Sequence, residues 1–315
     1  MYSQHFGLRL KPFELTPDAR AVFLSESHKE ALSVLQYGVV SSKGYLQLTG
    51  GIGTGKTTLL YVLAANLDCR YHLCLLTNPT LEISDFYYYI GEKLGLPFDG
   101  SKAKFLIQFA EFVTKCRLEN SRILFIVDEA HALPLNIFEE IRFLSNLPPE
   151  DQAILSIFLV GQPELLERLA DDRLAPLRQR IAIRFHIEPL TLQDTKEYIL
   201  FRLDRAGAGS RSIFTEKALE SVYKNTGGNP RLINVLCDNA LVSAFAADAL
   251  VVDEKIVQSC AAEMALPRKK KAGLLMKLRK KINPWWVAAA VVLLAVEIIG
   301  FYLGSVINDT LRSIF

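Results

Sequence analysis

The chain has 315 residues, of which 50% are hydrophobic, 22% are charged and five are cysteines without a C-x-x-C pair. So large an apolar fraction excludes a disordered chain, and the scattered cysteines argue against a disulfide scaffold or a structural zinc site and favour a reducing compartment. The formal net charge is +2, but eight Lys or Arg residues and no acid gather in residues 268–281, so the first 267 residues are mildly acidic and nucleic acid is not an expected partner.

Short apolar runs of strand length alternate with longer stretches of helical spacing, such as Phe105–Leu118, through residues 1–190. This alternation predicts an α/β domain over those residues, in which helices cover both faces of a parallel sheet. The predicted strands are Tyr45–Thr49, His72–Leu76, Ile123–Val127, Ile154–Val160 and Ile183–Ile187.

A glycine-rich loop joins the first predicted strand to a helical pattern. Residues 50–57 read GGIGTGKT and match G-x-x-x-x-G-K-[ST], the phosphate-binding loop of nucleotide-binding proteins. Backbone N–H groups of such a loop surround phosphate oxygens, Lys56 is expected to reach the β- and γ-phosphates, and the Thr57 hydroxyl is expected to ligate Mg²⁺. We therefore predict ATP and Mg²⁺ as cofactors. The loop residues predicted to bind the nucleotide are Gly50, Gly51, Ile52, Gly53, Thr54, Gly55, Lys56, Thr57 and Thr58.

Two acids follow the third predicted strand. Asp128 is expected to hold the Mg²⁺ shell, directly or through water, and Glu129 is expected to orient and polarise the attacking water. An acid pair at a strand end is common by itself, so the catalytic interpretation depends on its pairing with the phosphate loop. We interpret His131 as a helix cap or a polar contact residue rather than as a base.

Three arginines, Arg178, Arg180 and Arg184, lie in LRQRIAIRF, between a helical segment and the last predicted strand. Phosphoryl transfer needs positive charge at the γ-phosphate, and at least one of these side chains is expected to act as an arginine finger contributed by a neighbouring subunit. For each of them, a solvated basic face is the alternative.

The strands stop after Pro189, and the pattern becomes helical. We predict a second, helical domain over residues 191–265, with Thr215 as the N-cap of its second helix. The predicted helices are Gln193–Arg205, Glu216–Asn225, Pro230–Ala246 and Glu254–Met264.

A basic run and an apolar run follow. Residues 266–283 are predicted to be a polybasic juxtamembrane linker whose basic run, residues 268–281, contacts anionic lipids. Residues 284–304 contain one ionisable side chain, Glu297, and are long enough to cross a hydrocarbon core of about 30 Å as a single transmembrane helix. The alternative is a buried helix of a soluble domain.

The charges flanking this span predict its orientation. The basic run should stay on the cytoplasmic side, which leaves the N-terminal domains cytoplasmic and residues 305–315 as a short extracytoplasmic tail. Glu297 either belongs to a face that pairs with another helix or is a tolerated charge in an ordinary anchor.

Several motifs occur in the order typical of one group of ATPases. The phosphate loop, the VDE strand end, LVGQPEL, LRQRI followed by IEPL, and GGNPRLINVLC together resemble the AAA+ ATPases. The stretch HFGLRLKPFELTPDARAVFLSESHKEAL, with GQPEL and GNPR, looks specifically like the general secretion pathway protein A family, the ExeA-type membrane ATPases. The resemblance covers residues 1–265 and extends in layout to the predicted transmembrane helix.

This resemblance implies an AAA+ nucleotide-binding domain, a helical lid domain and an enzyme that converts ATP and water to ADP and phosphate. It also implies a single-pass protein of the bacterial inner membrane that forms homo-oligomers and drives or regulates the assembly of a secretion, pilus or polysaccharide-export machine. An inner-membrane or envelope-assembly protein is the expected partner. Such proteins commonly continue past the membrane helix into a peptidoglycan-binding domain, whereas this sequence stops at Phe315. We therefore do not expect direct cell-wall contact from this chain.

The same resemblance assigns two sensors. Gln162 matches the residue that senses the γ-phosphate, where many relatives have Asn, Ser or Thr; the alternative is a turn residue before Pro163. Arg231, in GNPR, matches the second sensor, which reaches ATP from the lid.

Two further roles come from the resemblance. Arg180 matches the arginine finger, with Arg178 as the second choice. Asn78 is expected to hold Glu129 inactive until a partner binds, or else to form only a turn with the proline after it.

Two other functional classes stay open from the sequence. One is a DNA-associated ATPase resembling the transposition regulators of the Mu B and TniB type, which the acidic globular part and the predicted span disfavour. The other is a scaffold that binds ATP to assemble, without turnover.

Overall fold

The computed structural model describes residues 2–14, 22–41, 44–77, 80–147 and 154–264, all within one compact unit, Met1–Pro267. Asn78 and residues 265–315, which include the predicted polybasic linker and transmembrane helix, lie outside the described residues. Among the residues that are described, no helix is both long enough and apolar enough to cross a bilayer.

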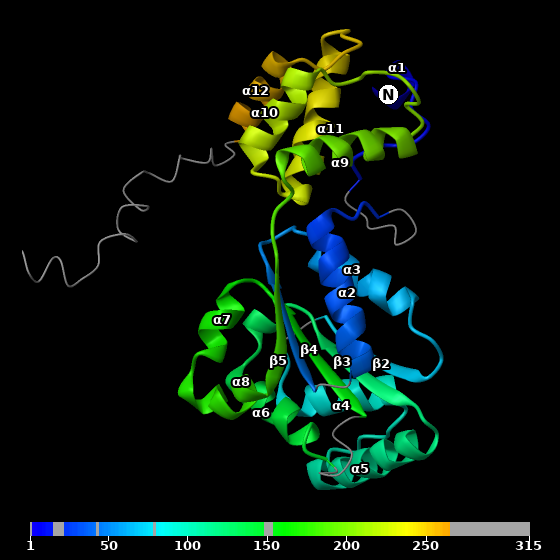
Figure 1. Cartoon of the computed structure of the whole chain (residues 1–315), viewed down its shortest axis with the longest axis vertical. Helices are drawn as coiled ribbons and strands as arrows, with labels where there is room; N and C mark the ends of the chain where they lie inside the picture. The colour runs from blue at the N-terminus through cyan, green and yellow to red at the C-terminus, as the bar shows by residue number, and fades with distance from the viewer. Residues whose placement is uncertain (1, 15–21, 42–43, 78–79, 148–153, 265–315) are drawn as a thin grey trace, which may run out of the picture. The chain divides into compact units, whose positions relative to one another are not determined.

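A five-stranded parallel sheet with helices on both sides forms the part of the fold drawn in the lower half of Figure 1. The strand order is β2-β3-β4-β1-β5, so β4 separates the strand that leads into the glycine loop from the strand that ends at the two acids. This confirms the predicted α/β fold and every predicted strand, with ends displaced by one or two residues. The strands are β1 (Tyr45–Gly50), β2 (Tyr71–Leu76), β3 (Arg122–Val127), β4 (Leu155–Gly161) and β5 (Ile181–Ile187).

Both faces of the sheet are covered, which explains why its central strands are almost uniformly apolar. In β3, Phe125 and Val127 pack into the core on one face, whereas Leu124 and Ile126 pack into the core on the other. Helices α2 (Glu26–Ser41) and α3 (Lys56–Ala65) cover the second of these faces (Figure 1). The first is covered by α4 (Ile83–Leu94), α5 (Lys102–Leu118), α6 (Leu135–Leu144), α7 (Glu164–Leu169) and α8 (Ala175–Arg180).

The chain becomes helical after Leu190, and these helices share a separate hydrophobic core. All four predicted helices are confirmed, while the predicted domain boundary between residues 190 and 191 stays a prediction. The helices are α9 (Leu192–Arg205), α10 (Glu216–Thr226), α11 (Pro230–Ala246) and α12 (Glu254–Glu263).

The N-terminal residues belong to this helical core rather than to the sheet. Helix α1 (Tyr2–His5) and the segment after it contribute Tyr2, Phe6 and Phe13 to the core. The Tyr2 hydroxyl donates a hydrogen bond to the Asp238 carboxylate. The first residues of the chain and the helices that follow the sheet therefore fold as one packed body.

The predicted cap of α10 is confirmed, and it yields a stability prediction. The Thr215 hydroxyl accepts a hydrogen bond from the Ala218 backbone N–H at 3.2 Å. Thr215→Ala should lower the free energy of unfolding by about 1 kcal/mol, because it leaves an N–H of the first turn without its partner. Thermal denaturation of the full chain measures this. Thr215→Ser keeps the hydroxyl and should be near wild type; equal losses in both variants would show that the cap is not the cause.

Candidate functional site

The glycine loop turns back on itself between β1 and α3. Gly53 and Gly55 have φ angles of 72° and 95°, in the left-handed region that glycine adopts without strain. Gly55 is the N-cap of α3, so the helix begins at Lys56 with the unpaired N–H groups of its first turn facing the loop. A helix N-terminus of this kind is a binding site for phosphate groups.

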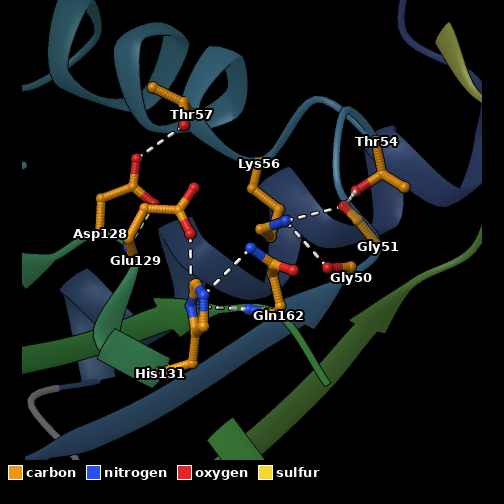
Figure 2. A network of polar contacts seen from close by, with 9 residues as sticks. All are labelled: Gly50, Gly51, Thr54, Lys56, Thr57, Asp128, Glu129, His131 and Gln162. Carbon is orange, nitrogen blue, oxygen red and sulfur yellow. Dashed lines mark hydrogen bonds and ion pairs between the residues drawn. The ribbon is translucent and has the colours of Figure 1, made fainter. Parts of the chain in front are cut away.

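Lys56 points into the loop rather than into solvent (Figure 2). Its side-chain ammonium donates hydrogen bonds to the carbonyl oxygens of Gly50 and Gly51, each at 2.8 Å. Burial lowers the pKa of Lys56, and the nearby carboxylates of Glu129 and Asp128 oppose that shift. The residue is 5% exposed, so the loop holds a cation that is largely removed from water and suited to an anionic ligand.

Asp128, at the end of β3, contacts the start of α3 directly. The Thr57 hydroxyl donates to a carboxylate oxygen of Asp128 at 2.6 Å, and the Glu129 backbone N–H donates to the other oxygen at 2.9 Å. Burial raises the pKa of Asp128, and these two hydrogen bonds oppose the shift. A hydroxyl and a carboxylate this close offer the oxygen ligands that Mg²⁺ prefers.

Glu129 differs from its neighbour in both backbone and partners. Its φ of 52° lies in the left-handed region, which is strained for a residue with a side chain. Its Oε2 atom is buried without a hydrogen-bond partner among the described residues, at 3.3 Å from the Nδ1 atom of His131. His131 in turn contacts the predicted sensor Gln162 (Figure 2).

A cavity of about 440 Å³ opens beside these residues. The loop and α3 line one side, together with Glu129. The helical region lines the other side through Tyr198, Arg202, Arg231 and Asn234. The predicted second sensor, Arg231, therefore faces the same cavity as Lys56.

Asn229, at the start of α11, fastens the helical region to the glycine loop. Its side-chain oxygen caps α11 by accepting from the Leu232 backbone N–H at 3.1 Å, while its amide nitrogen donates to the Ile52 carbonyl oxygen at 2.5 Å. A Cβ atom on Gly53 would lie 2.6 Å from the Cβ atom of Arg231. The loop and α11 are thus in direct contact, and glycine is required at position 53.

The three predicted arginines lie apart from this group. Arg180, at the end of α8, is exposed and donates hydrogen bonds to the Asn146 and Ser145 side chains. Arg178 donates to the Leu169 carbonyl oxygen, and Arg184 donates to the carbonyl oxygen of Arg178. None of them is among the described residues that line the cavity.

His28 has a role at the site that the sequence analysis did not assign. It is buried on α2, and its Nε2 atom lies 2.8 Å from the Thr54 carbonyl oxygen, while Ser25 contacts its Nδ1 atom at 2.7 Å. Burial lowers the pKa of His28, so the neutral ring donates to the loop and accepts from the serine. No local motif marks this contact, whereas Asn229 carried a signal: asparagine before proline at the start of a predicted helix is a typical N-cap.

The residues present fit a nucleoside triphosphate with Mg²⁺. A buried ammonium, the free N–H groups of a helix start, and a hydroxyl paired with a carboxylate meet beside one cavity. Volumes of several hundred Å³ are typical of sites for small ligands and cofactors. Lys56 and the loop would hold phosphate, and Thr57 and Asp128 would hold the metal ion.

Comparisons with known proteins agree with this geometry. Residues 39–169 match the AAA domain family. The chain is 36% identical over 295 residues to general secretion pathway protein A of Aeromonas hydrophila, an alignment that covers 91% of this chain and 54% of the relative. The chain therefore spans about half the length of that relative.

Two solved structures share the fold. The Drosophila origin recognition complex (ORC) bound to DNA matches with a TM-score of 0.64 and 17% identity, covering 90% of this chain and 69% of the other. The ORC2 protein of Aeropyrum pernix, in ADPNP–ADP complexes, matches with a TM-score of 0.59 and 18% identity, covering 80% and 71%. At these identities the likeness shows the fold alone.

The contact between the loop and α11 yields a binding prediction. Gly53→Ala should weaken ATP binding by about tenfold or more, because the new methyl group strains the backbone and collides with Arg231. Calorimetric titration of the full chain with ATP measures the change. Gly95→Ala is the matched control, since Gly95 has nearly the same φ, 71°, lies outside the loop, and would have nothing within 4 Å of an added Cβ atom. Equal affinities of Gly53→Ala and wild type would contradict the role of this contact.

Proposed function

We propose that this chain, whose residues 39–169 match the AAA domain family and which is similar to general secretion pathway protein A, is an AAA+ ATPase. In this proposal it binds ATP with Mg²⁺ and hydrolyses it to drive or regulate the assembly of a bacterial envelope machine. One observation carries the proposal: the Thr57 hydroxyl and the Asp128 carboxylate are 2.6 Å apart. This contact holds the phosphate loop against the acid pair, where phosphoryl transfer needs both.

Each of the chain's residues has a distinct task in this proposal. Lys56 and the first-turn N–H groups of α3 would bind the phosphates. Thr57 and Asp128 would hold Mg²⁺, which would neutralise the charge that develops on the phosphates. Glu129 orients the attacking water and accepts its proton. Bound ATP supplies the γ-phosphoryl group.

The two proposed sensors reach the nucleotide from different elements. Gln162 senses the γ-phosphate from the end of β4, and Arg231 binds the nucleotide from the start of α11. Asn229 and Gly53 join α11 to the loop. Loss of the γ-phosphate would therefore change the position of the helical lid relative to the sheet domain. This motion is the proposed output to a partner or to the membrane.

We further propose that neighbouring copies complete each other's sites. Arg180 is exposed and lies outside the described cavity lining, as expected of a finger that serves an adjacent subunit. Arg178, whose guanidinium donates to the Leu169 carbonyl oxygen, is the second choice. The proposed assembly is a homo-oligomer.

The proposed location is the bacterial inner membrane, with one transmembrane helix at residues 284–304 and the ATPase domain in the cytoplasm. The basic run at residues 268–281 would contact anionic lipid headgroups. The name of the Aeromonas relative supports a secretion system as the machine served, and an inner-membrane or envelope-assembly protein is the proposed partner.

Two substitutions separate binding from turnover. Lys56→Ala should abolish ATP binding, because it removes the buried cation of the loop. Glu129→Gln should bind ATP as wild type does and lose turnover by about 100-fold or more, because an amide accepts no proton from water. Nucleotide titration and phosphate release by the full chain measure both.

Equal hydrolysis by Glu129→Gln and wild type would contradict the role assigned to Glu129. ATP-dependent oligomers without phosphate release by wild type would identify a scaffold.

Mixing two inactive variants tests the finger. Arg180→Ala and Glu129→Gln should each be inactive alone, but their mixture should recover a fraction of wild-type turnover, since some interfaces then join an intact Glu129 to an intact Arg180 from the adjacent subunit. Phosphate release after mixing measures it, with Arg184→Ala as the control for loss of a nearby charge. Full activity of Arg180→Ala alone would transfer the role to Arg178.

A further inference from the structure

A histidine links the proposed water-orienting acid to the proposed γ-phosphate sensor. His131 lies in the short 3-10 helix η1 (Ala130–Ala132), directly after the β3 acids, and Gln162 directly follows β4. Strands β3 and β4 pair in parallel, so their C-terminal ends lie side by side. The two side chains are brought together there, as Figure 2 shows.

The imidazole ring contacts a different residue through each nitrogen. Its Nε2 atom lies 3.0 Å from the amide nitrogen of the Gln162 side chain. Its Nδ1 atom lies 3.3 Å from the Glu129 Oε2 atom. The Gln162 backbone N–H also approaches Nδ1, at 3.5 Å. It could donate only to an Nδ1 atom without a hydrogen, so we take the shorter contact of the side-chain amide with Nε2 as the one that fixes the tautomer. The ring therefore stands between the acid and the amide and contacts both.

These partners determine where the ring carries its proton. An amide nitrogen only donates hydrogen bonds, so the Nε2 atom of His131 accepts from Gln162. The neutral ring then carries its hydrogen on Nδ1, which faces the Glu129 carboxylate. Turning the Gln162 amide over would present its oxygen to Nε2; the ring would then donate from Nε2 and lose the Nδ1–H that faces Glu129.

The buried Oε2 atom of Glu129 lies beside the Nδ1 atom of His131. The Glu129 backbone is held in the left-handed region, and its Oε2 atom has no hydrogen-bond partner among the described residues apart from the approach of His131. A hydrogen on Nδ1 would therefore favour the direction of the carboxylate in which Oε2 stays beside the ring. The orientation of the Gln162 amide therefore determines whether the ring presents a hydrogen to the Glu129 carboxylate.

We propose that His131 is a positioning residue that couples the γ-phosphate sensor to the catalytic acid. An amide carries two N–H hydrogens, so the orientation of Gln162 that donates to His131 keeps the second hydrogen available for a phosphate oxygen. The orientation in which Gln162 acts as a sensor is thus the one in which His131 holds Glu129 in place. This inference rests on the proposed function, because it uses the roles proposed for Glu129 and Gln162.

Two replacements of His131 each keep one contact of the ring and remove the other. In His131→Asn, the amide nitrogen takes the place of Nδ1 and keeps the contact with Glu129, so turnover should stay within about threefold of wild type. In His131→Gln, the amide takes the place of Nε2 and keeps only the contact with Gln162, so turnover should fall by about tenfold or more, as in His131→Ala. Affinity for ATP should stay within about twofold in all three, because His131 is outside the described cavity lining.

A readout that needs no nucleotide completes the test. Nitrogen NMR of the histidine rings in the nucleotide-free full chain, with His131→Asn used to assign the signal, should show a proton on Nδ1 of His131. A ring protonated on Nε2 alone would overturn the inference, as would wild-type turnover in His131→Ala or equal turnover in the Asn and Gln variants. If those results appear while Glu129→Gln still binds ATP without hydrolysing it, the coupling fails and the proposed function stands.

Discussion

The hydrogen bond between Thr57 and Asp128 joins the glycine loop to the acid pair, and the proposed phosphoryl-transfer site depends on this contact. It spans two strand ends that are not neighbours, because β4 lies between β1 and β3. Gln162, directly after β4, contacts His131, which follows the acids. One strand order therefore produces both the contact between Thr57 and Asp128, the proposed metal ligands, and the network beside it.

The sequence predicted the elements well because their signals are local. The central strands β1, β3 and β4 are buried on both faces and consist largely of apolar residues. Thr215 and Asn229 each accept from a backbone N–H at the start of their helices. The glycine loop is formed by residues that are adjacent in the chain, so its motif alone predicted a turn that leads from a strand into the helix that begins at Lys56. Spacing and turn chemistry were sufficient for all of these.

Contacts between distant segments were not predictable in the same way. Tyr2 with Asp238, and His28 with Thr54, join surfaces whose local sequences are compatible with many partners. The apolar N-terminal segment carries no sign that it belongs to the helical core rather than to the sheet. Such pairings are decided by the packing of whole elements, and only the structure reveals them.

The two adjacent acids, Asp128 and Glu129, both carry a carboxylate, but their surroundings suit them to different roles. Asp128 accepts from the Thr57 hydroxyl and from the backbone, so both its oxygens are fixed. Glu129 begins from a strained φ and has one oxygen without a hydrogen bond among the described residues. Strain and an unpaired buried oxygen both cost stability, and they persist where a function requires them. The fixed carboxylate suits a metal ligand, whereas the carboxylate with an unpaired oxygen suits the proposed base that accepts a proton from water.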